Sequence, residues 1–150
     1  MDDMIKEAKL KALSLLNYMD RTESQLRQKL KEKSFSDEAI EQAIEYVKSF
    51  GYINDVGYAE RYIMGKQGAK SRREIYASLG QKGIRREVVE QAMENCYDSE
   101  DELTAIRHLC EKKHFLVEQA TDVEKRKMYQ YLLRKGFRND DICKVLRIQE

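Results

Sequence analysis

Apolar residues recur in the same order in three stretches of the chain, residues 30–44, 79–93 and 132–146. Each 15-residue stretch has an apolar side chain at its first, sixth, eleventh and fifteenth positions, and the copies are offset by 49 and then by 53 residues. Three copies in one register predict an internal repeat, and a repeat determines the whole architecture. The anchors are Leu30, Phe35, Ile40 and Ile44 in the first copy, Leu79, Ile84, Val89 and Met93 in the second, and Leu132, Phe137, Ile142 and Leu146 in the third.

The residue before the second anchor predicts a turn between two helices in each copy. Gly83 and Gly136 occupy this place, where the end of a helix favours a glycine in the left-handed conformation. Ser34 replaces the glycine in the first copy. We therefore expect a helix, a tight turn and a second helix in every copy, with the first turn less favourable or differently formed.

Polar start signals precede these helices. A hydroxyl residue followed three positions later by Glu or Gln forms a capping box, and such boxes occur at residues 22–25, 71–74 and 121–124. The third box begins its helix three residues earlier, relative to the turn, than the other two. Ser36 and Asn139 are the predicted N-caps of the helices that follow the turns.

A longer amphipathic helix is expected before each pair. Apolar positions between residues 4 and 20 follow the period of a helix, a second helix opens at Asn54 or Asp55, and a third lies near residues 100–113. Each repeat therefore consists of three helices. The predicted repeats are residues 1–51, 52–97 and 98–150.

The fold class that follows is all-α, with about nine helices in tandem three-helix repeats. No segment alternates strictly between apolar and polar residues, so no sheet is expected. A three-helix unit of this size encloses a poor core alone, and stacking the units buries the remaining apolar faces. We expect an elongated array that is able to curve. The aromatic residues expected to pack between helices are Phe35, Tyr52, Tyr58, Tyr62 and Phe137.

Composition narrows the class of protein. Charged residues make up 37% of the chain and proline is absent, which is typical of solvated helices. The three cysteines form no CxxC motif, so we expect a reducing, cytoplasmic location without disulfides. The acidic N-terminus does not resemble a signal peptide, and no stretch has the roughly 18 consecutive apolar residues of a membrane span.

Charge is unevenly distributed along the chain. The net charge is only +1, but residues 1–60 carry −3 and residues 61–86 carry +7. Basic side chains cluster at expected helix starts, near residues 70–73, at 85–86 and at 125–127. Cations beside unpaired helix N–H groups suit an anion or an acidic partner, although runs of charge are often merely solvated.

Signals for catalysis or metal binding are weak. Residues 65–67 lack the upstream glycine and the following Ser or Thr of a phosphate-binding loop. Cys110 and His114 have a spacing that suits two zinc ligands, but no fourth ligand is indicated nearby. We therefore expect no enzyme activity, no metal and no cofactor.

Four motifs together resemble the RecX family, bacterial regulators of the RecA recombinase. They are RTESQLRQKLKEKSF (residues 21–35), GYINDVGYAERYI (51–63), GAKSRREIYASLGQKGI (68–84) and KRKMYQYLLRKGFRNDDICKVL (125–146). The resemblance covers about residues 8–146, and the combination and order of the motifs are specific. The chain ends four residues after Leu146, whereas some family members continue.

The resemblance implies a function in recombination, DNA repair and the SOS response. RecX proteins are tandem three-helix proteins that bind RecA and the RecA–DNA filament and inhibit its ATPase, strand-exchange and co-protease activities. Many also bind single- or double-stranded DNA directly. Carried over by position, the expected contacts to RecA or DNA are basic residues. They are Lys66, Lys70, Arg72, Arg73, Lys82, Arg85, Arg86, Lys125, Arg126, Lys127, Arg134, Lys135 and Arg138.

A second hypothesis belongs to a different class. A stand-alone helical DNA-binding protein would use the same basic helix starts on bare DNA, with an affinity that falls steeply as salt rises. The near-neutral net charge weakens direct DNA binding more than RecA binding. In either case we expect a cytoplasmic monomer with no membrane partner.

Overall fold

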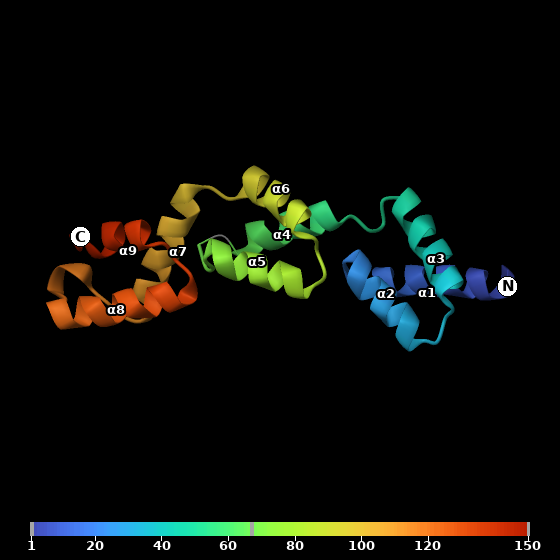
Figure 1. Ribbon diagram of the computed structural model, residues 1–150, viewed down its shortest axis with the longest axis horizontal. Coiled ribbons are helices and arrows are strands. Elements are labelled where there is room, and N and C mark those ends of the chain that lie inside the picture. The colour runs from blue at the N-terminus through green and yellow to red at the C-terminus, as the bar shows by residue number, and fades with distance from the viewer. Residues whose placement is uncertain (1, 67, 150) are drawn as a thin grey trace. The chain divides into compact units, whose positions relative to one another are not determined.

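The computed structural model describes residues 2–66 and 68–149. Over these residues it contains nine α-helices, one short 3-10 helix and no strand, which confirms the all-α prediction (Figure 1). The helices are α1 (Asp2–Tyr18), α2 (Glu23–Glu32), α3 (Asp37–Ser49), α4 (Asp55–Lys66), α5 (Arg72–Gln81), α6 (Arg86–Cys96), α7 (Ser99–Lys112), the 3-10 helix η1 (Val117–Gln119), α8 (Asp122–Lys135) and α9 (Asn139–Leu146).

The helices follow one another as three successive triplets, α1–α3, α4–α6 and α7–α9, which confirms the three-helix repeat. By its contacts the chain forms two compact units. Unit 1 contains Met1–Ala59 with Leu79–Gln91, and unit 2 contains Glu60–Ser78 with Ala92–Glu150. Helices α4, α5 and α6 thus contribute to both units. The repeat boundaries after residues 51 and 97 stay a prediction.

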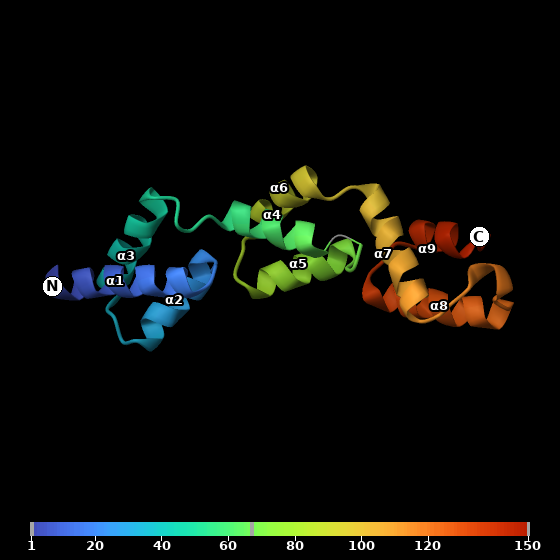
Figure 2. The same ribbon diagram turned by 180° about the vertical axis from the view of Figure 1, so that it is seen from behind.

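The core of unit 1 is built on the first triplet. Helix α1 packs against α2 and α3, as both views of the ribbon show (Figures 1 and 2). Ala8 and Ala12 of α1 are fully buried, and their small side chains let α1 approach the apolar faces of α2 and α3 closely. Leu26 and Leu30 of α2 complete this core without exposure to solvent.

The core of unit 2 includes the third triplet, in which α9 packs against both α7 and α8. Ile106 of α7, Leu132 of α8, and Ile142 and Leu146 of α9 are fully buried together. The anchor pattern therefore identifies the core well. Eleven of the twelve anchors are buried, and the twelfth, Phe35, is partly buried against the core of unit 1.

The three repeated turns have one conformation. Ser34, Gly83 and Gly136 all lie in the left-handed region, with φ of 66°, 83° and 99°. In each turn the next N–H donates back to the carbonyl five residues earlier, as from Phe137 to Leu132 at 3.2 Å. Of the two alternatives expected for the first turn, a different form is wrong, because Ser34 adopts the glycine conformation. The turn is instead less favourable, since a non-glycine residue in this region carries a strain of about 1 kcal/mol or slightly more.

Most predicted caps are confirmed. Thr22, Ser71 and Thr121 each accept a hydrogen bond from the backbone of the third helical residue, whose own side chain bonds back. Ser36 caps α3 through the Ala39 N–H at 3.2 Å. Asn139 does not cap α9: it is the first residue of that helix, and its side-chain oxygen accepts from the hydroxyl of Tyr129 instead.

The prediction for one aromatic residue is also wrong. Tyr52 is 52% exposed and stacks on Phe50, with ring centroids 5.5 Å apart. Gly51, in the left-handed conformation, turns the chain after α3. Ile53, the residue after Tyr52, therefore enters the core and is 6% exposed. The packing register is therefore shifted by one residue at this turn.

Candidate binding surfaces

A capping hydroxyl joins distant parts of the chain twice in the same way. In unit 1, Thr22 Oγ1 donates to the backbone carbonyl of Lys82 at 2.7 Å. In unit 2, Ser71 Oγ donates to the carbonyl of Lys135, also at 2.7 Å. Both hydroxyl residues are fully buried. The residue that starts the second helix of one repeat therefore also holds the end of the second helix of the next repeat.

The next amide in each helix makes a second equivalent contact. Glu23 N donates to Asp55 Oδ1 at 2.9 Å, and Arg72 N donates to Glu102 Oε1 at 3.0 Å. Asp55 is the first residue of α4, and Glu102 lies in the first turn of α7. A carboxylate from the following repeat thus satisfies an otherwise unpaired N–H at the helix start. We call this combination of hydroxyl, amide and carboxylate the repeat junction.

The turn glycines complete the repeat junction. A Cβ placed on Gly83 would lie 2.2 Å from Ser24 Cβ, and one on Gly136 would lie 2.9 Å from Arg73 Cβ. Glycine is needed there for close approach as well as for its left-handed φ. Ser34 and Thr121 are both exposed, and no junction of this kind forms at them among the described residues. This explains how Ser34 tolerates a side chain.

The junction of unit 2 engages several of the predicted binding residues. Arg72 lies 5.1 Å above the Tyr97 ring and pairs with the buried carboxylate of Glu102, with Nε and Oε2 3.6 Å apart. Arg73 Nη2 donates to the carbonyl of Arg134 at 2.9 Å. These two predicted binding residues contribute to the folded structure and do not merely project into solvent.

Other predicted residues near this junction also have partners. Lys135 Nζ lies 3.7 Å from a carboxylate oxygen of Glu74. Lys70 Nζ donates to the hydroxyls of Tyr62, at 3.1 Å, and Ser78, at 3.4 Å. Lys66 lies over the ring of Tyr62, 5.8 Å from its centroid. In unit 2 these cations therefore contact groups of the chain itself, which are a carboxylate, two hydroxyls and an aromatic ring.

The predicted residues of unit 1 are more widely exposed. Arg85 and Arg86 at the start of α6 are exposed, and Arg86 pairs with Glu90 one turn later at 3.1 Å. The backbone of Lys82 accepts the hydrogen bond of Thr22, and its side chain is half-buried. Lys82 and Arg85 border two different hollows.

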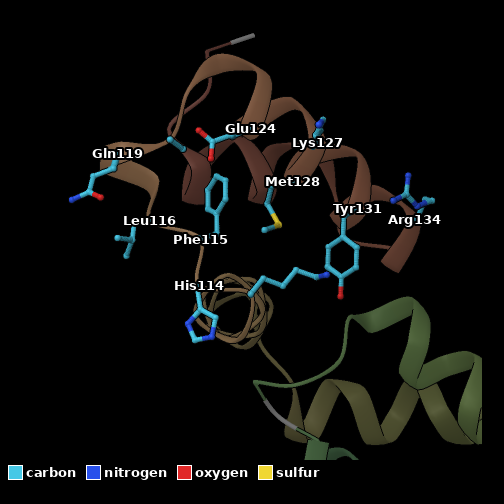
Figure 3. Close-up of a pocket in the computed structure, with 11 residues that line it drawn as sticks. His114, Phe115, Leu116, Gln119, Glu124, Lys127, Met128, Tyr131 and Arg134 are labelled. Atoms are coloured by element: carbon cyan, nitrogen blue, oxygen red, sulfur yellow. The ribbon is translucent and has the colours of Figure 1, made fainter.

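Helix α8 carries the largest group of accessible cations, and it has a hollow along each of two sides. Lys125 and Arg126 border a hollow of about 690 Å³ that Arg147 also lines. Lys127 and Arg134 border a second hollow of about 680 Å³ (Figure 3). Arg138 is exposed at the N-terminal boundary of α9. We call Lys125, Arg126, Lys127 and Arg134 the α8 cations.

The possible zinc pair is not part of a larger ligand cluster. Within the described residues, no three His, Cys, Asp or Glu side chains come together as a metal site requires. Cys110 is buried, and burial raises the pKa of its thiol, whereas His114 is exposed in a left-handed turn with φ of 57°. No described helix has the length and apolar character needed to cross a bilayer.

Sequence comparison identifies each repeat separately. The chain matches the family models for the first, second and third three-helix domains of RecX over residues 8–46, 54–93 and 100–146. It is 39% identical to the regulatory protein RecX of Caldanaerobacter subterraneus subsp. tengcongensis, over 95% of this chain and 71% of that protein. It is 37% identical to the RecX of Clostridium perfringens strain SM101, over 95% of this chain and 67% of that one.

Solved structures agree with the sequence matches. The crystal structure of RecX from Lactobacillus salivarius superposes with a TM-score of 0.82 at 26% identity, covering 98% of this chain and 97% of that one. A second crystal structure of a regulatory protein RecX gives a TM-score of 0.83 at 25% identity, over 99% of this chain and 73% of the other. All three repeats, in order, match one family, and the chain therefore belongs to the RecX family of regulatory proteins.

Proposed function

We propose that this chain binds the RecA recombinase, or the filament that RecA forms on DNA, and mainly inhibits its ATPase, strand-exchange and co-protease activities. The observation that carries the proposal is the ordered match of all three repeats to RecX domains. In this proposal the protein is a cytoplasmic monomer that acts by binding and catalyses no reaction.

The α8 cations are the best-supported contacts in this proposal. Arg72, Arg73 and Lys135 already have internal partners at the junction of unit 2, so a new partner would have to compete with those contacts. The α8 cations instead border open hollows. Cations in such positions suit the acidic side chains of a protein or the phosphates of DNA.

In this proposal the repeats supply more than one contact surface on a single chain. Basic residues occur at helix starts in the second repeat, as at Arg85 and Arg86, and again along α8 in the third. Linked weak sites on a repetitive polymer raise the overall affinity without stronger individual contacts. A RecA filament is such a polymer, which favours regulation at low stoichiometry.

Titration of RecA's DNA-dependent ATPase with this chain tests the proposal, with binding to bare DNA measured in parallel over a salt series. We expect inhibition below one copy of this chain per RecA, together with weak binding to bare DNA. The alternative, a stand-alone DNA-binding protein, requires tight binding to bare DNA. The logarithm of its association constant should fall by about 0.9 per phosphate contact for each tenfold rise in salt concentration. Tight, salt-sensitive DNA binding without ATPase inhibition would reject the proposal in favour of that alternative.

A further inference from the structure

A groove in the third repeat has features that the contacts proposed above do not use. It is the hollow of about 680 Å³ between the end of α7, η1 and one side of α8. Phe115 packs against the buried cluster that contains Met128, and Tyr131 and Arg134 line the groove toward the end of α8 (Figure 3). Leu116 lines the same groove and is 61% exposed. Phe115 is half-buried and Met128 is only 7% exposed, so the apolar surface open to solvent beside α8 belongs mainly to Leu116 and Phe115.

Local backbone features fix both walls of this groove. The left-handed His114 ends α7, and the Phe115 N–H donates to the Cys110 carbonyl at 2.8 Å, which directs the chain away from the helix. On the other side, the capping box of Thr121 and Glu124 fixes the start of α8. The groove is thus formed by ordered turns on both sides, and a ligand that enters it meets a largely preformed site.

The rim of the groove is mainly basic. Lys113 Nζ lies 4.3 Å from the centroid of the Tyr131 ring, and Lys127 and Arg134 line the wall on α8. In the described part of the chain, none of these three cations forms an ion pair. The single acidic lining residue, Glu124, already accepts a hydrogen bond from the Thr121 N–H at 3.1 Å. The rim therefore favours an anionic ligand.

The apolar floor and the basic rim together favour one class of partner. We propose that this groove binds a short acidic peptide segment that inserts one bulky apolar side chain against Phe115, Met128 and Leu116. Its carboxylates would contact Lys113, Lys127 and Arg134. A single nucleic-acid strand matches the charge of the rim and can stack its bases on aromatic rings. Its flat bases nevertheless fill a floor that includes Met128 and Leu116 less completely than a bulky apolar side chain does. The groove shares Lys127 and Arg134 with the α8 cations, and its apolar floor adds a contact that the proposed function does not use.

Fluorescence anisotropy of the full chain with a short fluorescein-labelled peptide tests the inference directly. The probe is a run of aspartates that ends in phenylalanine, and the control peptide has alanine in place of the phenylalanine. We expect the phenylalanine peptide to bind at least about tenfold more tightly, since one buried apolar anchor carries much of the energy of such a contact. Equal binding of the two peptides, or no binding, would overturn the inference.

Variants locate the site on the surface. Leu116→Asp and Lys127→Glu should each weaken binding, by about tenfold and by several-fold, because both side chains are exposed and line the groove. Val123→Asp and Lys144→Glu are matched controls, exposed on α8 and α9 and outside the groove, and should bind as the unaltered chain does. Equal weakening by a control and its matched variant would contradict the assignment.

A second measurement does not depend on any variant. In a chain labelled at its methionine methyl groups, the phenylalanine peptide should shift the NMR resonance of Met128 through the ring current of its aromatic side chain. Methionines outside the groove, such as Met4 and Met64, should not shift. Displacement of the peptide by an oligothymidine, without a change at Met128, would identify a general polyanion site and reject the peptide groove.

Discussion

The side-chain hydroxyl of Ser71 donates a 2.7 Å hydrogen bond to the backbone carbonyl of Lys135, 64 residues further along the chain. Thr22 makes the same bond to Lys82 across 60 residues. In both places a residue that begins one helix also fixes the end of a helix in the next repeat. A helix cap thus serves as a tertiary contact, and this dual role leads to tests of how the repeats are joined.

Removal of the Ser71 hydroxyl should lower the free energy of unfolding more than removal of a hydroxyl that only caps a helix. Ser71→Ala loses the N-cap, about 1 kcal/mol, and leaves the Lys135 carbonyl without its donor, which adds about 1–2 kcal/mol. Thr121→Ala is the matched control, because Thr121 forms the same capping box while exposed. It should lose only about 1 kcal/mol. Equal losses in urea unfolding would show that the bond to Lys135 adds nothing to stability.

The turn glycines should differ in their tolerance of alanine. Gly51 and Gly83 both have positive φ, of 72° and 83°. A Cβ on Gly51 meets nothing within 4 Å, whereas one on Gly83 meets Ser24 at 2.2 Å. Gly51→Ala should therefore cost about 1 kcal/mol from the backbone alone, and Gly83→Ala about 1–3 kcal/mol more. Thermal or urea unfolding measures both, and the idea of close approach fails if the two losses match.

The buried carboxylate of Glu102 should contribute far more to the free energy of unfolding than an exposed carboxylate does. Glu102 is 2% exposed and is the partner of both the Arg72 amide and the Arg72 side chain. Glu102→Ala should lower the free energy of unfolding by about 3 kcal/mol, since the Arg72 N–H loses its acceptor and the Arg72 guanidinium loses its carboxylate. In the control Glu118→Ala, the exposed pair with Arg147 is lost, and the cost should stay below about 0.5 kcal/mol. Similar small losses in both variants would show that the junction carboxylate is dispensable.

The carboxylate of Glu23 should make stability depend on pH. It lies 2.7 Å from Lys48 Nζ and 3.1 Å from Arg27 Nε. Burial alone would raise the pKa of Glu23, but the hydrogen bonds from Lys48 and Arg27 outweigh burial and lower its pKa. Because the pKa of Glu23 is lower in the folded chain than in the unfolded chain, the ionised carboxylate stabilises the folded state. This stabilisation is complete when the pH is above the pKa in the unfolded chain, about 4.3, and it is lost as the pH falls through the pKa in the folded chain.

The variant Glu23→Gln tests this dependence. It should lower the free energy of unfolding by about 1 kcal/mol near neutral pH, a value reduced by the partial exposure of the pair. The difference between the variant and the unaltered chain should shrink toward zero as the pH falls below the folded pKa. A difference that stays constant across that range would mean that the ionised carboxylate is not the stabilising form.

The local features of the fold were predictable from the sequence because they depend on neighbouring residues. The capping boxes and the turn glycines lie within a few positions of the groups they satisfy, and the apolar anchors repeat on helical spacing. The junction was not predictable in the same way, because Thr22 and Lys82 are 60 residues apart. Its only sequence signal is the recurrence of a hydroxyl cap and a later glycine at a similar spacing in successive repeats.

Prediction of the binding residues was limited for a related reason. Arg72 and Arg73 look like free cations at a helix start, but whether they meet solvent depends on Glu102 and on the carbonyl of Arg134, which arrive from the next repeat. A charge reversal at Arg72 would place an acid beside buried Glu102 and disturb folding. Functional variants are therefore better placed on the α8 cations.

The most direct test of the account is inhibition of RecA's DNA-dependent ATPase by the unaltered chain and by the triple variant Lys125→Glu, Arg126→Glu, Lys127→Glu. A matched control reverses three exposed lysines on and after α2, Lys29, Lys31 and Lys33, with the same change in net charge. We expect the unaltered chain and the control to inhibit at less than one copy per RecA, and the α8 variant to need at least about tenfold more protein. Undiminished inhibition by a folded α8 variant would contradict the assignment of α8, and absence of inhibition by the unaltered chain would contradict the proposed function itself.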